Sequence, residues 1–516
     1  MNNLKFIPTP QWAPDLAETS TAVQDLNGLY PISLDENRGV VYTSIPLPTP
    51  LSVEPLPGRP LGEVGFTNTV GEHINIVGTK SDIYKLLDDG SWGSVKPESI
   101  TLSDESEGDE YVNIQDWEFT RFGDNVLGVS GIYYPVVLKS GADNFIELPG
   151  NPPRAQRIAV VSDFVFLGGI EGHPTRIQWS GYNNSEIWEG DGENQSDFQD
   201  LLGGGGDVVR IVGGDIGYVF QQNSIRRVEF QGGDVIFSIE NILPEIGTDA
   251  PGSICRQGKS IFFYGHNGFY ALHAASAELD FIGANTVNDF FRRHTDKSSL
   301  ATVRSAVDFK RSLVWWCYSS RGNRGVLDRA LIYNFTNGLW AKQQNQNYVH
   351  VGTLNPRGAF MDELDDTEFF PDPTGMDTPN APPLDDPVFQ GGVDFAVFTS
   401  NVADGTYEAN TLSGPPQSGQ LCTQPLFSDT GRKIFTSRVR PSALRVSQVD
   451  PIVVTTFYKD QTFDGYTEGD TYEVDVDTQE VNPDVESLYQ YYRLTFPKGI
   501  KHLFGVFIDS KPGGAR

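Results

Sequence analysis

The sequence contains little cysteine and no long apolar run, and each shortage excludes a class of protein. The three cysteines in 516 residues, Cys255, Cys317 and Cys422, are far apart and form no Cys-x-x-Cys pair, so neither a disulfide framework nor a zinc motif is indicated. Cys255 and Cys317 lie in apolar segments, which favours buried free thiols. No run of about 18 apolar residues is present, so we expect no membrane-spanning helix.

Basic residues are scarce as well. Lysine and arginine together number 38 against 68 acidic residues, which gives a net charge of −30. Proteins that grip phosphates show the reverse balance, so the charge argues against tight nucleic-acid binding. A conduit for DNA must also avoid holding it, although a plain acidic surface explains the charge equally well. The N-terminus lacks the basic and apolar regions of a signal peptide, and we therefore expect no ordinary secretion.

Metal-binding and phosphate-binding motifs are missing from the sequence. The seven histidines show no His-Glu-x-x-His or His-x-His spacing, and His266 and His273 are interpreted as ordinary histidines of one hairpin. Residues 464–465 and 475–477 lack the repeated oxygen ligands of a calcium loop. The four glycines at 203–206 are not followed by Lys-Ser/Thr, which favours a flexible turn. We expect no metal site and no cofactor.

The sequence contains no clear catalytic motif either. Residues 88–92, Asp-Asp-Gly-Ser-Trp, resemble one Asp-box turn of a sialidase, but the pattern occurs once, and an ordinary Asp-Gly hairpin is the favoured interpretation. No Gly-x-Ser-x-Gly elbow is present, and no carboxylate pair for glycoside hydrolysis stands out among the 68 acidic residues. No catalytic residue is assigned, and we expect that the protein is not an enzyme.

What the sequence does contain is a repeated pair of short apolar strands. The first strands are expected at 74–77, 125–129, 164–167, 217–220, 261–264 and 313–316, and their partners at 83–86, 132–134, 177–179, 225–228, 269–272 and 332–335. The starts of the partner strands are 49, 45, 48, 44 and 63 residues apart. A period in the high forties is typical of one four-stranded propeller blade.

Further strands and turns complete the blades. Asp89-Gly90, Asn267-Gly268 and Asn337-Gly338 suit hairpin turns that need positive φ. The sequence therefore predicts an all-β protein with a propeller of about six four-stranded blades. Insertions at 281–300 and 319–330 make the sixth blade irregular, and a short helix is expected at 290–294. Inner strands are expected at 63–66, 111–114, 157–161, 208–212, 253–255 and 305–309, and outer strands at 145–148, 280–282 and 339–341.

The regions that flank the repeats differ in composition. Residues 1–59 are expected to form an extended, Pro-rich N-terminal arm that wraps a neighbouring subunit or crosses its own domain. The propeller is assigned to 60–350, an acidic Pro-rich linker or loop to 351–388, and a smaller β-sandwich-like domain to 389–516. Strands of this C-terminal domain are expected at 393–398, 434–440, 451–458, 491–496 and 503–508. One of the termini is a candidate to supply a closing strand to the propeller.

One stretch carries a family likeness. Residues 174–188 read Pro-Thr-Arg-Ile-Gln-Trp-Ser-Gly-Tyr-Asn-Asn-Ser-Glu-Ile-Trp, in which a strand is followed by an Asn-rich turn and a tryptophan anchor. This stretch resembles a segment of the tail nozzle and tail hub proteins of short-tailed bacteriophages (podoviruses), although the turn lacks their proline. Residues 14–31 and 431–441 resemble the N-terminal anchors and a late strand of the same proteins, so that the likeness runs through the chain in order.

The resemblance implies a structural role without enzymatic activity. Its members form a ring, here expected to be a homohexamer, below the head–tail adaptor protein. The assembled channel lets genomic DNA pass during ejection without specific binding, and the ring anchors tail fibres or spikes and a tip or plug protein. It also implies a location in the viral tail of a virion that assembles in the host cytoplasm. The alternatives are a carbohydrate-active or glycan-binding propeller that acts on a host surface polysaccharide, and a general interaction scaffold.

Overall fold

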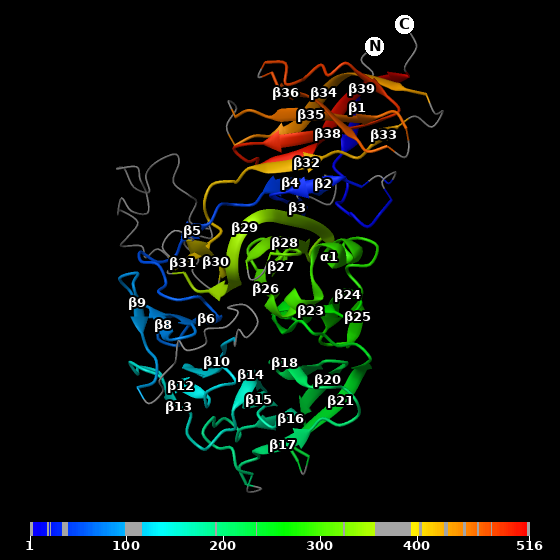
Figure 1. Cartoon of the computed structure of the whole chain (residues 1–516). Helices are drawn as coiled ribbons and strands as arrows, with labels where there is room; N and C mark the ends of the chain where they lie inside the picture. Colours follow the sequence, from blue (N-terminus) through cyan, green and yellow to red (C-terminus); the bar gives the residue numbers. More distant parts are fainter. Residues whose placement is uncertain are drawn as a thin grey trace.

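The protein is built almost entirely of β-strands in the computed structural model (Figure 1). The structure describes residues 4–17, 20, 22–33, 40–98, 116–190, 193–233, 235–323, 326–356, 394–401, 405–427, 432–446, 450–461, 464–475 and 477–512. Within these ranges the helices are α1 (Asn288–His294) and two short 3-10 helices, η1 (Pro251–Ser253) and η2 (Lys297–Thr302).

Six antiparallel sheets form the blades of a propeller, which confirms the predicted fold class. In blades one to five the first strand lies innermost, and the following strands lead outward by hairpins. Blades one to five contain four strands each. Their bounds are β6 Gly62–Thr67, β7 His73–Gly78, β8 Ile83–Leu86 and β9 Trp92–Ser94; β10 Glu118–Phe122, β11 Asn125–Val129, β12 Val136–Leu138 and β13 Ile146–Glu147; β14 Ala155–Val161, β15 Phe164–Ile170, β16 His173–Trp179 and β17 Asp197–Asp200; β18 Val208–Val212, β19 Ile216–Gln221, β20 Ser224–Phe230 and β21 Phe237–Pro244; β22 Cys255–Gln257, β23 Ser260–Gly265, β24 Gly268–His273 and β25 Glu278–Asp280.

The sixth blade is larger than the others. It begins with β26 (Arg304–Asp308), β27 (Leu313–Tyr318) and β28 (Leu327–Asn334), and its fourth strand β29 (Leu339–Leu354) runs on for 16 residues. The far end of β29 pairs with β30 (Asp394–Asn401), which pairs in turn with β31 (Thr406–Thr411) and β5 (Thr49–Pro50). This corrects the predicted boundaries at 350 and 389, because the residues after 393 continue the propeller sheet. The rest of the predicted linker, 357–388, lies outside the described residues.

The N-terminal strand β5 completes the sheet of the sixth blade, so one terminus does supply a strand to the propeller, and side chains also link this blade to the first. The side-chain amide of Asn75 donates to the carbonyl of Asn355 at 2.8 Å, and the backbone N–H of Asn355 donates back to Asn75 Oδ1 at 2.6 Å. Gly65 allows this approach, since a Cβ there would lie 2.6 Å from the backbone nitrogen of Asn355. Both asparagines are buried, so their polar groups depend on each other for hydrogen bonds.

The N-terminal and C-terminal segments together form a β-sandwich of two six-stranded sheets. One sheet has the order β3-β4-β39-β34-β37 with β1 against β39, and the other has the order β2-β32-β38-β35-β36 with β33 against β38. Strands from the two ends of the chain therefore pair directly, as Phe6 does with Phe507. The bounds are β1 Leu4–Pro8, β2 Asp25–Asn27, β3 Leu29–Ser33, β4 Val40–Ser44, β32 Gly419–Cys422, β33 Leu426–Phe427, β34 Ile434–Leu444, β35 Val453–Lys459, β36 Thr467–Glu473, β37 Val485–Ser487, β38 Tyr489–Phe496 and β39 His502–Pro512.

This sandwich corrects the prediction of an extended arm at 1–59. Both β3 and β4 are rich in buried residues, and β4 pairs with β39 through Tyr42 and Leu503, which lie more than 450 positions apart in the sequence. The Pro-rich stretch after β4 hid this pairing, because it suggests irregular structure throughout the segment. Figure 1 shows these blue strands between the sixth blade and the orange and red strands of the sandwich.

One hydrophobic core joins the sandwich to the propeller. Trp12, buried in the N-terminal segment, packs edge-on against Phe290 of α1 with ring centroids 5.2 Å apart. The carboxylate of Asp15 accepts hydrogen bonds from the backbone N–H groups of Asp289 and Phe290, at 2.7 Å each. The same core contains residues from the fifth and sixth blades and from both sheets of the sandwich, including Phe262, Trp315, Trp316, Tyr348, Val439, Tyr492 and Leu503.

Most of the predicted strands are confirmed, and three need correction. All six first strands are found as β7, β11, β15, β19, β23 and β27, and the helix expected at 290–294 is α1. The partner strand expected at 132–134 is wrong, because Gly131 turns the chain with φ +79° and pairing resumes only at the buried Val136. Residues 251–253 form η1, so β22 starts at Cys255, and β25 ends at Asp280 rather than spanning 280–282. The strand expected at 111–114 lies outside the described residues, and β10 is the inner strand of that blade.

Candidate functional site at the propeller axis

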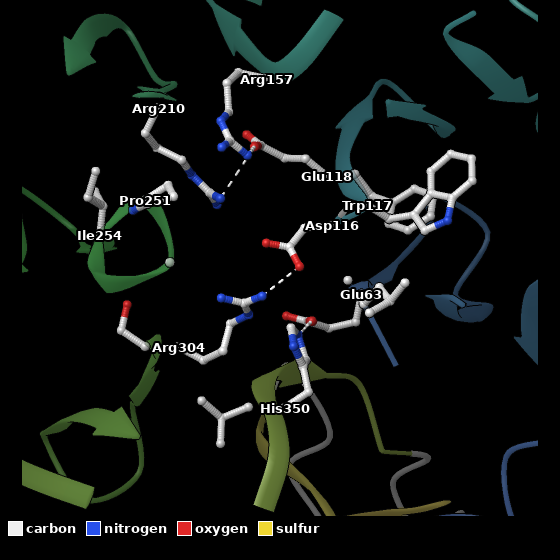
Figure 2. A pocket seen from close by; sticks show the side chains of 16 residues that line it. Glu63, Asp116, Trp117, Glu118, Arg157, Arg210, Pro251, Ile254, Arg304 and His350 are labelled. Carbon is white, nitrogen blue, oxygen red and sulfur yellow. Dashed lines mark hydrogen bonds and ion pairs between the residues drawn. The ribbon is translucent and has the colours of Figure 1, made fainter. Parts of the chain in front are cut away.

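Charged side chains from five blades converge on the propeller axis (Figure 2). The inner strands are short and mostly apolar, but the residues that face the axis cannot pack against a neighbouring blade, so polar groups are tolerated there. The carboxylates and the arginines face one another around a cavity of about 100 Å³. The charged groups are Glu63 on β6, Asp116 and Glu118 at the start of β10, Arg157 on β14, Arg210 on β18, Arg304 on β26 and His350 on β29.

Ion pairs bridge the blades across this cavity. Glu118 Oε2 lies 3.6 Å from a guanidinium nitrogen of Arg157 and 3.3 Å from one of Arg210, so two arginines share one carboxylate. Arg304 donates to Asp116 at 2.5 Å. The side chains of Glu63 and His350 are also in direct contact, which ties the first blade to the sixth. The blades are thus linked electrostatically as well as by packing.

The shared carboxylate does not satisfy both arginines. Distances of 3.3 and 3.6 Å exceed the 2.7–2.9 Å that is usual for a charge-assisted hydrogen bond. Arg157 Nε and Glu118 Oε2 are buried and have no hydrogen-bond partner among the residues that the structure describes. Burial lowers the pKa of the Arg157 guanidinium below its usual value, although the charge of Glu118 opposes this shift. The buried Nε group of Arg157 is therefore left without a hydrogen-bond partner among the described residues.

The size of the axial cavity limits which molecules it can hold. A volume of about 100 Å³ holds several water molecules, since one water needs roughly 10–15 Å³ by this measure. Duplex DNA, whose major groove alone is about 12 Å wide, does not fit. The axial cavity between the described residues is therefore too small to hold a DNA duplex.

The residues that the sequence singled out as candidates lie apart from the axis. Asp89 caps the turn between β8 and β9 by accepting from the backbone N–H of Ser91 at 2.9 Å, as expected for an ordinary hairpin. His266 contacts the carbonyl of Gln222 at 2.7 Å, whereas His273 contacts Asp280 at 2.9 Å, so the two histidines share no ligand geometry. Residues 203–206 form the turn between β17 and β18. Within the described ranges, no group of three or more His, Cys, Asp or Glu is arranged to hold a metal ion.

The cysteines are free thiols in the structure. Cys317 and Cys422 are buried, and burial raises the pKa of the Cys422 thiol to about 12. Burial likewise raises the pKa of Cys255 to about 12, opposed by a contact with Ser305. Such thiols are almost entirely protonated near neutral pH, which makes them poor nucleophiles.

The stretch that carried the family likeness forms β16 and a folded turn. Arg176 makes two hydrogen bonds to Asp200 of β17, at 2.7 and 2.9 Å, and lies over the Phe198 ring at 4.0 Å. Trp188 is buried in a cluster with residues of the second blade, and its indole N–H donates to the carbonyl of Ser185 at 2.8 Å. This confirms that the tryptophan anchors the turn. Tyr182 at the tip of the turn is 55% exposed and stacks on Phe230.

The other two stretches of the likeness take part in the sandwich and its joint to the propeller. Asp15 contacts α1, and β2 and β3 begin within residues 25–31. In β34, Arg440 lies 4.7 Å from the centre of the Phe507 ring on β39. Gly431 lies outside the described residues.

Sequence reasoning missed the axial charges. A signal was present, because Glu63, Arg157 and Arg210 each interrupt an apolar inner strand with one charged residue. The sequence does not show which charged residues form ion pairs, since Glu118 and Arg210 are 92 positions apart and meet only in the folded ring.

Comparisons with known proteins identify no family for this chain. No protein-family model matches the chain, and no curated protein matches it. Solved structures with a similar arrangement include the extracellular domain of a one-component system from B. thetaiotaomicron, at 8% identity and a TM-score of 0.41 over 91% of this chain. The chain spans 62% of the length of that protein. Virginiamycin B lyase from Staphylococcus aureus is 12% identical over 69% of this chain and 97% of its own, with a TM-score of 0.36, and the N-terminal domain of Nup159 is 10% identical over 72% and 96%, with a TM-score of 0.34.

The sheet topology of the chain itself defines an all-β propeller protein, with a sandwich built from both ends of the chain. Among the described residues, no helix has the length and apolar character needed to cross a membrane.

Proposed function

We propose that this protein is a structural subunit of the ring-shaped tail nozzle or hub of a short-tailed bacteriophage. The proposal rests first on the likeness of residues 174–188 and on the order of N-terminal segment, propeller and C-terminal β domain. In this role the protein is not an enzyme. It contacts the head–tail adaptor, further copies of itself, tail fibres or spikes and a tip protein, and it resides in the virion tail after assembly in the host cytoplasm.

The observation that best supports a structural role is the single core that joins the propeller to the sandwich. Trp12, Phe290 and Trp316 belong to one buried cluster that extends into both sheets of the sandwich. A large hydrophobic interface of this kind opposes relative movement of the two parts. A subunit of this construction suits a ring that must transmit force and hold a fixed diameter.

The closed axis and the net charge of −30 fit the same proposal. Because the axial cavity is too small for a duplex, the channel of the proposed ring lies between copies of the chain. A strongly acidic surface repels the phosphate backbone, so DNA slides past such a surface instead of binding to it.

The proposal predicts a defined ring. Purified protein, alone and with extracts of assembling virions, is expected to form particles near six times 56.9 kDa with an open centre. Mass photometry measures the mass, and negative-stain imaging measures the symmetry. A chain that remains a monomer under both conditions would overturn the proposal.

A glycan-binding propeller is the second candidate, and one surface feature favours it. Tyr182 and Phe230, 55% and 38% exposed, stack with ring centroids 6.4 Å apart and planes 14° from parallel. Exposed aromatic faces next to polar groups such as Asn183 form an apolar platform on which a sugar ring can lie.

This candidate predicts measurable binding to host surface polysaccharide. The Tyr182→Ala variant is expected to weaken that binding roughly tenfold, which corresponds to about 1.4 kcal/mol of lost contact. Tyr134→Ala is the matched control, because Tyr134 is 47% exposed on another blade. Polysaccharide retention in a pull-down is the measurement, and equal retention by the two variants or no retention by the wild type would exclude the candidate.

A further inference from the structure

A second cavity, a groove of about 200 Å³, lies between the first and the second blade. Its first wall comes from the β6–β7 turn and from Lys85 on β8, and its second wall comes from β11 and the β12–β13 turn. The groove shares no lining residue with the axial cavity. It therefore opens on the face of the propeller where the first and second strands of these blades are joined.

The floor of the groove is apolar and fixed in place. Ile74, Val126 and Leu138 lie at the bottom and are 7%, 1% and 6% exposed. All three belong to one hydrophobic core that the two blades share. Because packed cores relax little, this floor keeps its shape and offers apolar contact to the C–H groups of a ligand.

The rim of the groove is polar, and its groups are held by hydrogen bonds. Lys85 Nζ donates to Glu72 Oε1 at 2.9 Å, and Asn68 Nδ2 donates to Glu72 Oε2 at 3.0 Å. Asp124 of the second blade accepts from the backbone N–H of Thr69 in the first blade at 3.1 Å. Groups that are already positioned cost little ordering entropy when a ligand binds.

The charges and the size of the groove limit the class of ligand. Its lining contains three carboxylates, on Glu72, Asp124 and Asp143, and two ammonium groups, on Lys85 and Lys139. An anion meets repulsion from the carboxylates, and a cation gives the ammonium groups no acceptor. Hydroxyl groups can donate to a carboxylate and accept from an ammonium group. The volume lies below the range of about 300–1,000 Å³ for pockets of larger ligands, which favours a single ring.

We propose that this groove binds one neutral sugar residue, with hydroxyl groups on the charged rim and C–H groups on the apolar floor. The site differs from the Tyr182–Phe230 platform, which belongs to the third and fourth blades. Both lie on the same face, because the β16–β17 and β20–β21 connections stand at the same end of their blades as the β12–β13 turn. This inference does not depend on the proposed ring.

The experiment combines saturation-transfer difference NMR with isothermal calorimetry on the full-length protein, with glucose, galactose, mannose and rhamnose as probes. We expect at least one of these sugars to bind saturably, with one site per chain and a dissociation constant in the millimolar range. Glucuronate, a sugar ring that carries a carboxylate, is expected not to bind. Lack of saturable binding by all of the neutral sugars, or saturable binding of glucuronate, would overturn the proposal.

Matched variants locate the bound sugar. Ala142 is exposed in the β12–β13 turn at the mouth of the groove, so Ala142→Phe is expected to obstruct the groove and weaken binding at least tenfold. Ala275→Phe is the control, because it makes the same change at an exposed position of the β24–β25 turn in the fifth blade. Lys85→Met removes a donor and should weaken binding severalfold, whereas Tyr182→Ala should leave it unchanged. Unchanged affinity in Ala142→Phe, or a loss in Tyr182→Ala, would place the sugar elsewhere and refute the assignment.

Discussion

The Trp12→Ala variant is expected to lose about 3–5 kcal/mol of unfolding free energy, the range for removing a fully buried tryptophan. Trp12 is 1% exposed and packs against Phe290 at the joint between the sandwich and the propeller. Its ring also lies 5.6 Å from the ammonium group of Lys342, which pairs with Asp25 of β2. Truncation therefore removes apolar contacts and uncovers the buried side chain of Lys342.

Removal of the Trp12 side chain should also change the number of unfolding transitions. Since one core joins the two parts, we expect the wild type to unfold in a single urea transition by circular dichroism. In Trp12→Ala the sandwich is expected to unfold before the propeller, so that two transitions separate. Leu16→Ala is the control, because Leu16 lies in the same segment and is 39% exposed. A Trp12→Ala midpoint equal to that of Leu16→Ala would contradict the role assigned to the joint.

The second large effect is expected from Glu118→Ala at the axis. Glu118 is 6% exposed and is the shared partner of Arg157 and Arg210. Its removal leaves two arginines close together without their carboxylate, and breaking a buried pair in this way costs about 3–5 kcal/mol. The measurement is the free energy of unfolding from urea titration.

A surface ion pair provides the control for the Glu118→Ala variant. Glu171 lies 3.5 Å from Arg154 and is 67% exposed, so Glu171→Ala is expected to cost less than about 1 kcal/mol. Salt should distinguish the two, because screening acts on exposed pairs more than on buried ones. Equal costs for Glu118→Ala and Glu171→Ala would mean that the axial charges do not hold the blades together.

The blades could be predicted from the sequence because the strands of one blade follow one another along the chain. Each hairpin joins neighbouring segments, and buried strands such as β15 and β27 are continuous apolar runs bounded by turn residues. The partner strand at 132–134 was misplaced for a local reason too, because Ile132 and Tyr134 have the composition of a strand but are about half exposed. Apolar composition alone does not distinguish a strand from an exposed turn.

The candidate site could not be predicted in the same way. A charged residue within an apolar strand, such as Arg210, looks the same in sequence whether it faces solvent, an axis or a partner subunit. The role of Arg210 depends on the carboxylates of Glu118 and Asp116, which belong to another blade. The catalytic and metal motifs considered from the sequence required fixed short spacings, and the axial cluster has none.

By itself, the sequence determined the strands, the turns and the repeat, because alternation and turn chemistry act over a few residues and record which side chains are buried. The tertiary structure decided which strands pair across the chain. The pairing of β1 with β39 and of β4 with β39 joins segments more than 450 positions apart, and the joint around Trp12 follows from it. It also decided the axis, where Glu63, Glu118, Arg157, Arg210 and Arg304 become neighbours only because the blades are arranged in a ring. The sequence of a single strand indicates which of its side chains are buried. It does not indicate which distant strand will pair with it.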